Sequence, residues 1–138
     1  MSEILLNVEN LKKYFPIKKG ILSKTVGYVK AVDDVSFKIN KGETLGLVGE
    51  SGCGKTTIGR TLLRLIEPTG GKVVFDGEDV TAVDANALKK LRKDMQIIFQ
   101  DPYSSLNPRL TAGAAIREPM YVHGLYKDDK ERKEMVMQ

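Results

Sequence analysis

Cysteine, histidine and long apolar runs are scarce in this chain of 138 residues. Cys53 is the only cysteine, so neither a disulfide framework nor a cysteine-based metal cluster can form within the chain. No apolar run reaches membrane-spanning length, and the first residues lack the basic head and apolar stretch of a signal peptide. His123, the only histidine, precedes Gly124 in a polar turn, and we assign it no role. These absences predict a cytoplasmic protein.

A net charge of +4 raises the question of nucleic-acid binding. The lysines are scattered or stand in short pairs, and the sequence has neither a basic stripe studded with aromatic residues nor a recognition motif. We therefore interpret the positive charge as a solvated surface. The length allows one modest domain, and the hydrophobic and charged contents are ordinary for a globular protein.

The most informative segment is GESGCGKT at 49–56, which fits the pattern G-x-x-x-x-G-K-[ST] of phosphate-binding loops. An apolar run with the composition of a strand precedes it at 43–48. Leucines and isoleucines at helical spacing follow over 57–66 and end at Glu67-Pro68. Because a phosphate-binding loop joins a strand to a helix, this context supports the motif. The sequence predicts a site for a nucleoside triphosphate.

The residue types in the loop match that chemistry. The glycines let the backbone turn sharply, so that successive N–H groups face an anion at a helix N-terminus. Lys55 is expected to bridge the β- and γ-phosphates, and the Thr56 hydroxyl to bind Mg²⁺. Cys53 is either a small filler or a thiol that bound nucleotide shields from alkylation. The predicted nucleotide-binding residues of the loop are Gly49, Glu50, Ser51, Gly52, Cys53, Gly54, Lys55, Thr56 and Thr57. The alternative is a glycine-rich turn beside a solvated lysine.

Patterning along the chain predicts the remaining elements. Strands are expected at 4–14, 28–39, 43–48, 72–76 and 95–99, and helices at 57–66, 84–93, 114–121 and 127–138. A basic connection is expected at 16–27. The composition shifts at Asp101 towards turn-forming residues, which predicts a boundary near residue 100.

The loop, a strand ending in Gln100, and QDPYSSLNPR at 100–109 together resemble the ATPase subunits of ABC transporters. More narrowly, they resemble those of oligopeptide and dipeptide importers, as does the lengthened segment between Leu11–Pro16 and Ala31–Phe37. The resemblance implies an α/β fold: a P-loop NTPase core with an antiparallel β lobe over 1–100, and the start of a helical subdomain over 101–138. The sheet is expected to be incomplete, with unpaired apolar edges at 45–48 and 97–99, because the family's intervening strands come later in its sequence.

The resemblance also implies roles for individual residues. Tyr14 matches the aromatic residue that stacks on adenine; Phe15 competes for this role, and a tyrosine simply packed on the lobe is the alternative. Gln100 matches the glutamine that approaches Mg²⁺ and the attacking water, so Gln100 and Lys55 are the catalytic contributors. The segment Asp101–Arg117 matches the region that faces the coupling helices of a permease.

The family's LSGGQ signature, its Asp-Glu strand end and its switch histidine have no counterpart in these residues. We therefore expect the chain to bind ATP and Mg²⁺ without hydrolysing ATP. The expected partners are a second ATPase subunit, identical or different, and transmembrane permease subunits at the inner face of the cell membrane. Peptides are the expected solute, although nickel and glutathione importers carry similar ATPases. Two alternatives stay open: another P-loop enzyme such as a kinase or GTPase, and a non-catalytic regulatory truncation.

Overall fold

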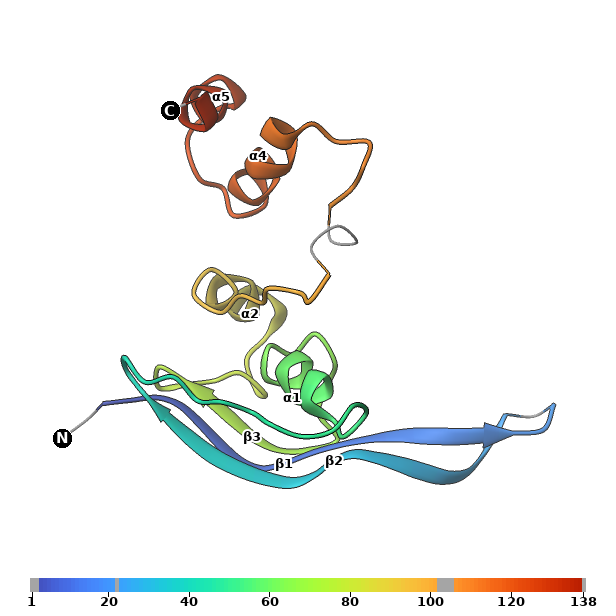
Figure 1. The fold of residues 1–138 in the computed structure, drawn as a ribbon. Coiled ribbons are helices and arrows are strands. Elements are labelled where there is room, and N and C mark those ends of the chain that lie inside the picture. The colour runs from blue at the N-terminus through green and yellow to red at the C-terminus, as the bar shows by residue number, and fades with distance from the viewer. Residues whose placement is uncertain (1–2, 22, 102–105, 138) are drawn as a thin grey trace. The chain divides into compact units, whose positions relative to one another are not determined.

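The computed structural model describes residues 3–21, 23–101 and 106–137, which form two compact units divided between Leu88 and Lys89. The first unit contains β1 (Ile4–Lys19), β2 (Lys24–Asn40), α1 (Lys55–Leu62), β3 (Gly70–Phe75) and β4 (Glu78–Asp79) (Figure 1). Helix α2 (Ala85–Leu91) spans the division, and α4 (Ala112–Val122) and α5 (Asp129–Met137) belong to the second unit. The boundary near residue 100 rests on composition and stays a prediction.

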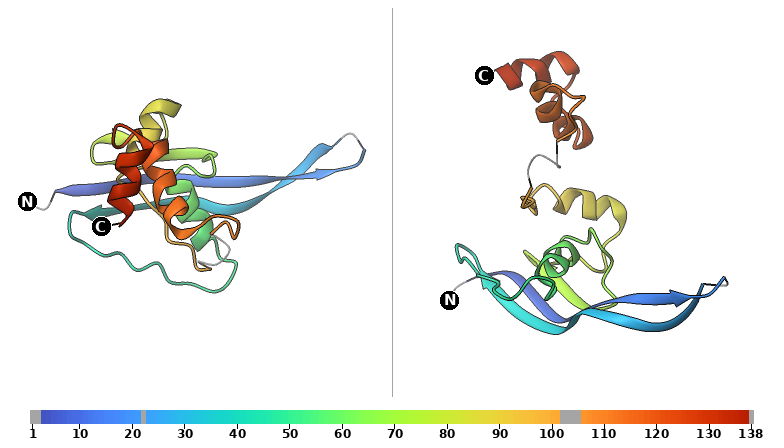
Figure 2. Two further views of the ribbon diagram at one scale, coloured as in Figure 1. Left: turned by 90° about the horizontal axis from the view of Figure 1, so that it is seen from above. Right: turned by 45° about the vertical axis from the view of Figure 1, so that its right-hand side comes forward.

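The four strands form one antiparallel sheet in the order β2-β1-β3-β4. Strand β1 is central, so that Val8 pairs with Phe37 of β2 on one side and Val73 of β3 on the other. Val8 and Val73 are almost completely buried, and α1 lies over one face of the sheet (Figures 1 and 2). The predicted antiparallel β lobe is therefore confirmed.

A bulge in β1 keeps the apolar residues on the buried face. The β1–β2 register shifts between Val8 and Leu11, and Asn10 has a φ of 50°. The Asn10 N–H donates to the side-chain hydroxyl of Ser36 in β2 at 2.8 Å. The extra residue changes the phase of the alternation, so Leu11 is fully buried three positions after Val8.

The expectation that residues 16–27 form a connection outside the strands is wrong. Strand β1 continues to Lys19 and β2 starts at Lys24, so most of this segment is a long two-stranded ribbon (Figure 2). Strand β3 pairs with β1 only as far as Lys12, and beyond that point β1 is an edge strand. Pro16 is tolerated there because an edge strand can spare one N–H group.

The later helices begin where capping residues satisfy their first N–H groups. Asp84 accepts a hydrogen bond from the Ala87 N–H at 2.8 Å before α2, and Thr111 caps α4. Asp128 accepts from the Glu131 N–H at 2.8 Å before α5. The predicted helices at 84–93, 114–121 and 127–138 are confirmed with slightly different ends.

Within the second unit, α4 and α5 form a pair held by an ion pair and a close approach. The Arg117 guanidinium lies 2.9 Å from Asp129 Oδ1, and Lys133 joins the other oxygen of this carboxylate at 3.0 Å. A Cβ atom on Gly113 would lie 3.6 Å from Val136. The hydrogen bond from Lys133, with a smaller contribution from the charge of Arg117, lowers the pKa of Asp129.

The predictions of strands at 43–48 and 95–99 are wrong, since neither segment is a strand. A strand needs a neighbour to take up its N–H and C=O groups, and the described residues supply none to these segments. Most of their apolar side chains are exposed, with Val48 at 93% and Ile98 at 96%. The expectation of an incomplete sheet is confirmed, although residues 45–48 and 97–99 are unpaired segments and not edge strands.

Among the helices of the described residues, none combines the length and the apolar character that crossing a bilayer requires.

Candidate nucleotide-binding site

The predicted loop reaches α1 through a left-handed turn. Gly52 has a φ of 82° and Gly54, the N-cap of α1, has a φ of 100°. Gly54 offers no side chain to cap the helix, and the first intrahelical bond runs from the Ile58 N–H to the Gly54 carbonyl at 2.9 Å. The N–H groups of the first turn are therefore left for an anion, where the helix dipole also favours negative charge.

Gly54 also determines where the loop lies on the sheet. A Cβ atom at this position would stand 2.3 Å from the backbone oxygen of Ala31 in β2. No real Cβ atom approaches a carbonyl oxygen so closely, so only glycine allows the loop to pack on this strand. The position is doubly restricted, by its φ and by its neighbour.

The Lys55 ammonium lies over the loop. Its Nζ donates to the carbonyl oxygens of Gly49 and Glu50, both at 2.6 Å, and lies 3.5 Å from Cys53 Sγ. The positive charge of Lys55 and the uncapped N–H groups therefore belong to the same short stretch of the chain. An entering phosphate would replace the two hydrogen bonds from Lys55 to these carbonyl oxygens. The exchange is favourable because a hydrogen bond from the ammonium to a charged phosphate is stronger than one to a neutral carbonyl.

The threonines that follow differ in their surroundings. Thr56 is exposed in the first turn of α1, and within the described residues its hydroxyl has no hydrogen-bond partner. The hydroxyl of buried Thr61 donates to the Thr57 carbonyl at 2.7 Å, a hydrogen bond within α1 itself. Because Mg²⁺ prefers oxygen ligands and is usually held by few protein groups plus phosphates, Thr56 fits a magnesium ligand.

Tyr14 is half-buried in β1, opposite the part of β2 that the loop contacts. It pairs with Lys30 of β2, whose neighbour Ala31 is the residue that Gly54 approaches. The Tyr14 hydroxyl donates to Asp33, and Lys30 Nζ lies 5.2 Å from the centre of the Tyr14 ring and 3.1 Å from Asp33 Oδ2. The same unit thus contains the aromatic ring and the phosphate loop.

These contacts shift the ionisation of the three groups in a consistent way. The hydrogen bond to the Asp33 carboxylate raises the pKa of Tyr14, because it favours the protonated hydroxyl. The same bond, together with Lys30, lowers the pKa of Asp33. Asp33 in turn raises the pKa of Lys30. Tyr14, the residue predicted to stack on adenine, therefore stays protonated and neutral, and its hydroxyl is hydrogen-bonded to Asp33 of β2.

Gln100 is not part of the loop's unit. It is an exposed residue of the second unit, so its approach to Mg²⁺ stays a prediction. Of the predicted permease-facing segment, residues 102–105 lie outside the described residues, and residues 112–117 form the start of α4.

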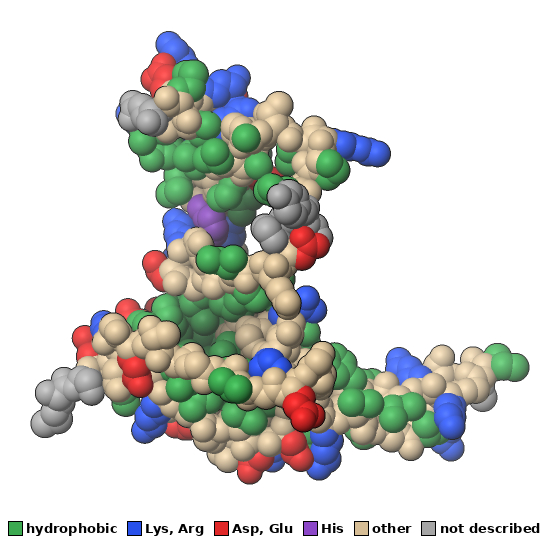
Figure 3. Space-filling view, in the orientation of Figure 1, with side chains coloured by type: hydrophobic (Ala, Val, Ile, Leu, Met, Phe, Trp, Pro, Cys, Tyr) green, Lys and Arg blue, Asp and Glu red, His purple; other side chains and the backbone are tan. Residues whose placement is uncertain are grey.

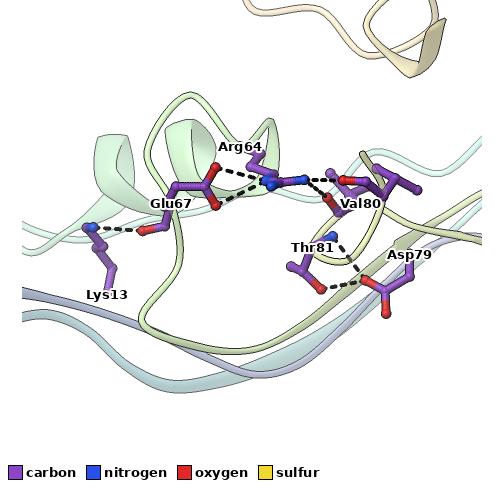
Figure 4. A network of polar contacts seen from close by, with 7 residues as sticks. Lys13, Arg64, Glu67, Asp79, Val80 and Thr81 are labelled. Atoms are coloured by element: carbon purple, nitrogen blue, oxygen red, sulfur yellow. Dashed lines mark hydrogen bonds and ion pairs between the residues drawn. The ribbon is translucent and has the colours of Figure 1, made fainter. Parts of the chain in front are cut away.

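Sequence reasoning missed Arg64, which ties the end of α1 to the β3–β4 side of the unit (Figure 4). Its Nη1 donates to the carbonyls of Val83 at 2.7 Å and Val80 at 3.3 Å, and its Nε lies 3.0 Å from both carboxylate oxygens of Glu67. Lys13 donates to the Glu67 carbonyl at 2.7 Å. An arginine among the leucines and isoleucines of LLRLI was the signal available in the sequence.

Comparison with known proteins gives consistent results. A family model described as ABC transporter matches residues 32–138. The oligopeptide transport ATP-binding protein AppF of Bacillus subtilis is 51% identical over 136 residues, which are 98% of this chain and 41% of that protein. The glutathione import ATP-binding protein GsiA of Escherichia coli is 51% identical over 124 residues, 90% of this chain and 20% of that protein.

Solved structures extend the similarity to the fold. The post-hydrolysis dimer of the ATP-binding cassette MJ0796, bound to ADP and Pi, superposes with a TM-score of 0.73 at 27% identity. The match covers 96% of this chain and 54% of that one. The chain thus spans about half of this cassette and less than half of these curated relatives. The family model over residues 32–138 and the similarity of the fold agree that this chain belongs to the ABC transporter family.

Proposed function

We propose that this chain is the ATP-binding part of an importer ATPase that couples ATP hydrolysis to the uptake of oligopeptides or dipeptides. The observation that carries the proposal is the loop before α1, where uncapped N–H groups and the Lys55 ammonium lie together. The printed names of the relatives, oligopeptide transport and glutathione import, favour a peptide solute.

Lys55, Thr56, the backbone at the start of α1 and Tyr14 have distinct parts in binding. Lys55 exchanges the carbonyls of Gly49 and Glu50 for the β- and γ-phosphates, while the backbone N–H groups at the start of α1 donate hydrogen bonds to the phosphate oxygens. Thr56 holds Mg²⁺ against the same phosphates. Tyr14, tied by Asp33 and Lys30, offers its ring to adenine; a flat aromatic ring binds any base by stacking without reading its edges.

Hydrolysis needs groups beyond those residues. It requires a positioned water and stabilisation of the charge on the transferring phosphoryl group. Gln100 and Lys55 contribute to this, but the 138 residues contain no LSGGQ string. The chain therefore binds ATP without turning it over, and complete activity requires a second ATPase subunit, identical or different.

Coupling to transport involves the second unit. Residues 101–138 begin the helical subdomain, after the core at 1–100, and Asp101–Arg117 faces the permease. In this arrangement the protein is cytoplasmic and peripheral, at the inner face of the cell membrane. A permease and an external binding protein, not these residues, select the solute.

Competition binding with a fluorescent ATP analogue, combined with phosphate release, tests this function. We expect ATP and GTP to displace the analogue with similar affinity, because stacking does not read the base, and phosphate release to stay at background. Phosphorylation of a small acceptor would instead favour a kinase. Co-purification with an intact ATPase subunit would favour a regulatory truncation that binds nucleotide and pairs with full-length subunits.

A further inference from the structure

The ribbon that extends beyond the sheet carries charge of one sign. We call residues 13–19 of β1 and 24–30 of β2 the basic ribbon, with Ile21 in the turn at its tip. Between residues 10 and 32 the sequence has no aspartate or glutamate. The six lysines of that stretch are Lys12, Lys13, Lys18, Lys19, Lys24 and Lys30. A uniform charge on a projecting ribbon points to an anionic partner.

The lysines near the sheet are already partnered and those near the tip are not. Lys12 lies 3.7 Å from Asp34, and Lys30 lies 3.1 Å from Asp33. In the described part of the chain, no carboxylate pairs with the tip lysines at 18, 19 and 24. Lys19 stands directly across from Lys24, and like charges in opposite positions destabilise a strand pair. An anionic surface would relieve this repulsion.

Apolar side chains are exposed along the same end of the ribbon. Ile17 is 41% exposed, Tyr28 is 61% exposed and Ile21 at the tip is fully exposed. Figure 3 shows hydrophobic and basic side chains side by side along this arm. A two-stranded ribbon is marginally stable in water, so burial of these groups would stabilise it.

The register places apolar side chains on both faces of the ribbon. Phe15 and Val29 are directly opposite and share one face, whereas Pro16 and Tyr28 share the other, because successive residues of a strand alternate. A protein groove covers one face of a ribbon. Apolar groups on both faces and at the tip suit a medium that surrounds the ribbon.

We propose that the tip of the basic ribbon inserts into an anionic lipid surface. The apolar side chains at Ile17, Ile21 and Val26 enter the boundary between headgroups and acyl chains, while Lys18 and Lys24 reach back to lipid phosphates. This direct lipid contact requires neither nucleotide nor permease. The proposal can therefore be tested separately from ATP binding.

Vesicle flotation with the 138-residue chain tests the electrostatic part, because bound protein rises with the lipid and aggregates do not. The vesicles are phosphatidylcholine with or without phosphatidylglycerol. We expect binding only with phosphatidylglycerol.

Replacing Lys18, Lys19 and Lys24 by Gln should weaken vesicle binding on the order of 100-fold, at roughly fivefold per lysine. The matched control replaces three exposed lysines outside the ribbon, Lys89, Lys90 and Lys93, by Gln and should bind nearly as the parent does. Equal weakening in both triple variants would overturn the proposal.

Insertion is tested separately with a tryptophan reporter, since the chain contains no tryptophan. The emission of Ile21→Trp should shift to the blue with phosphatidylglycerol vesicles and be shielded from acrylamide. The emission of Tyr121→Trp, at an exposed site in α4, should not change. No shift at Ile21→Trp would contradict insertion, and so would an equal shift with polyglutamate in place of vesicles, which would indicate an acidic protein partner. Each variant is compared with the parent by circular dichroism, and the reporter variant remains decisive if the triple variant does not fold.

Discussion

Replacing Gly54 by alanine tests whether the loop is held by the backbone of β2. The new Cβ atom would lie 2.3 Å from the Ala31 carbonyl oxygen, and this neighbour is backbone that cannot rotate away. The φ of 100° adds strain, since a left-handed conformation costs an L-residue about 1–2 kcal/mol. Overpacking adds about 1–3 kcal/mol. We expect Gly54→Ala to lower the free energy of unfolding by about 2–5 kcal/mol.

Two further glycines separate strain from collision. Gly52 has a φ of 82° but open space around it, so Gly52→Ala should cost only the strain, about 1–2 kcal/mol. Gly59 lies inside α1 with open space and no positive φ, so Gly59→Ala should stabilise the protein by about 0.5–1 kcal/mol. The three substitutions add the same methyl group within eight residues of sequence.

Urea unfolding followed by circular dichroism measures all three variants, with binding of an ATP analogue as a second readout. Gly54→Ala should lose stability and affinity together, because the displaced loop no longer presents its N–H groups. An equal loss in Gly52→Ala and Gly54→Ala would refute the packing argument and leave only strain. A stabilised Gly54→Ala variant would refute both.

Three other predictions concern side chains of the first unit. Arg64→Met should lower the free energy of unfolding by about 2–3 kcal/mol, because two backbone carbonyls lose a charged donor, whereas Lys38→Met at an exposed strand position should change it little. In an absorbance titration at alkaline pH, Asp33→Asn should bring the last tyrosine transition to lower pH, since Asp33 raises the pKa of Tyr14 and keeps its proton bound to higher pH; an unchanged titration would contradict the hydrogen bond. Cys53 is exposed beside Lys55, so labelling by a maleimide should slow when ATP is added, and an unchanged rate would place the nucleotide elsewhere.

The elements that the sequence predicts well are those whose signals are local. The glycines of the loop, the leucine spacing behind it and the capping residue Asp84 each act within a few positions. The helices after residues 54, 84, 111 and 128 therefore appear where patterning predicts them, and so does the uncapped helix start beside Lys55.

What the sequence could not predict depends on distant neighbours. Residues 43–48 and 95–99 have the composition of strands, but pairing requires strands that the described residues do not supply. The basic ribbon is the reverse case. Pro16 and Gly20 are typical of a connection, but this segment of β1 forms a strand because β2 pairs with it. The contact between Gly54 and Ala31, and the reach of Arg64 to Val83, join segments with no mutual pattern in the sequence.

The central claim is that Lys55 and the loop around it hold the phosphates of ATP. Isothermal titration of the chain with MgATP measures this directly, with Lys55→Ala as the variant and Lys89→Ala as the control at an exposed lysine of α2. We predict one ATP per chain for the parent and the control, and no measurable heat of binding for Lys55→Ala. Unchanged affinity in Lys55→Ala would contradict the account.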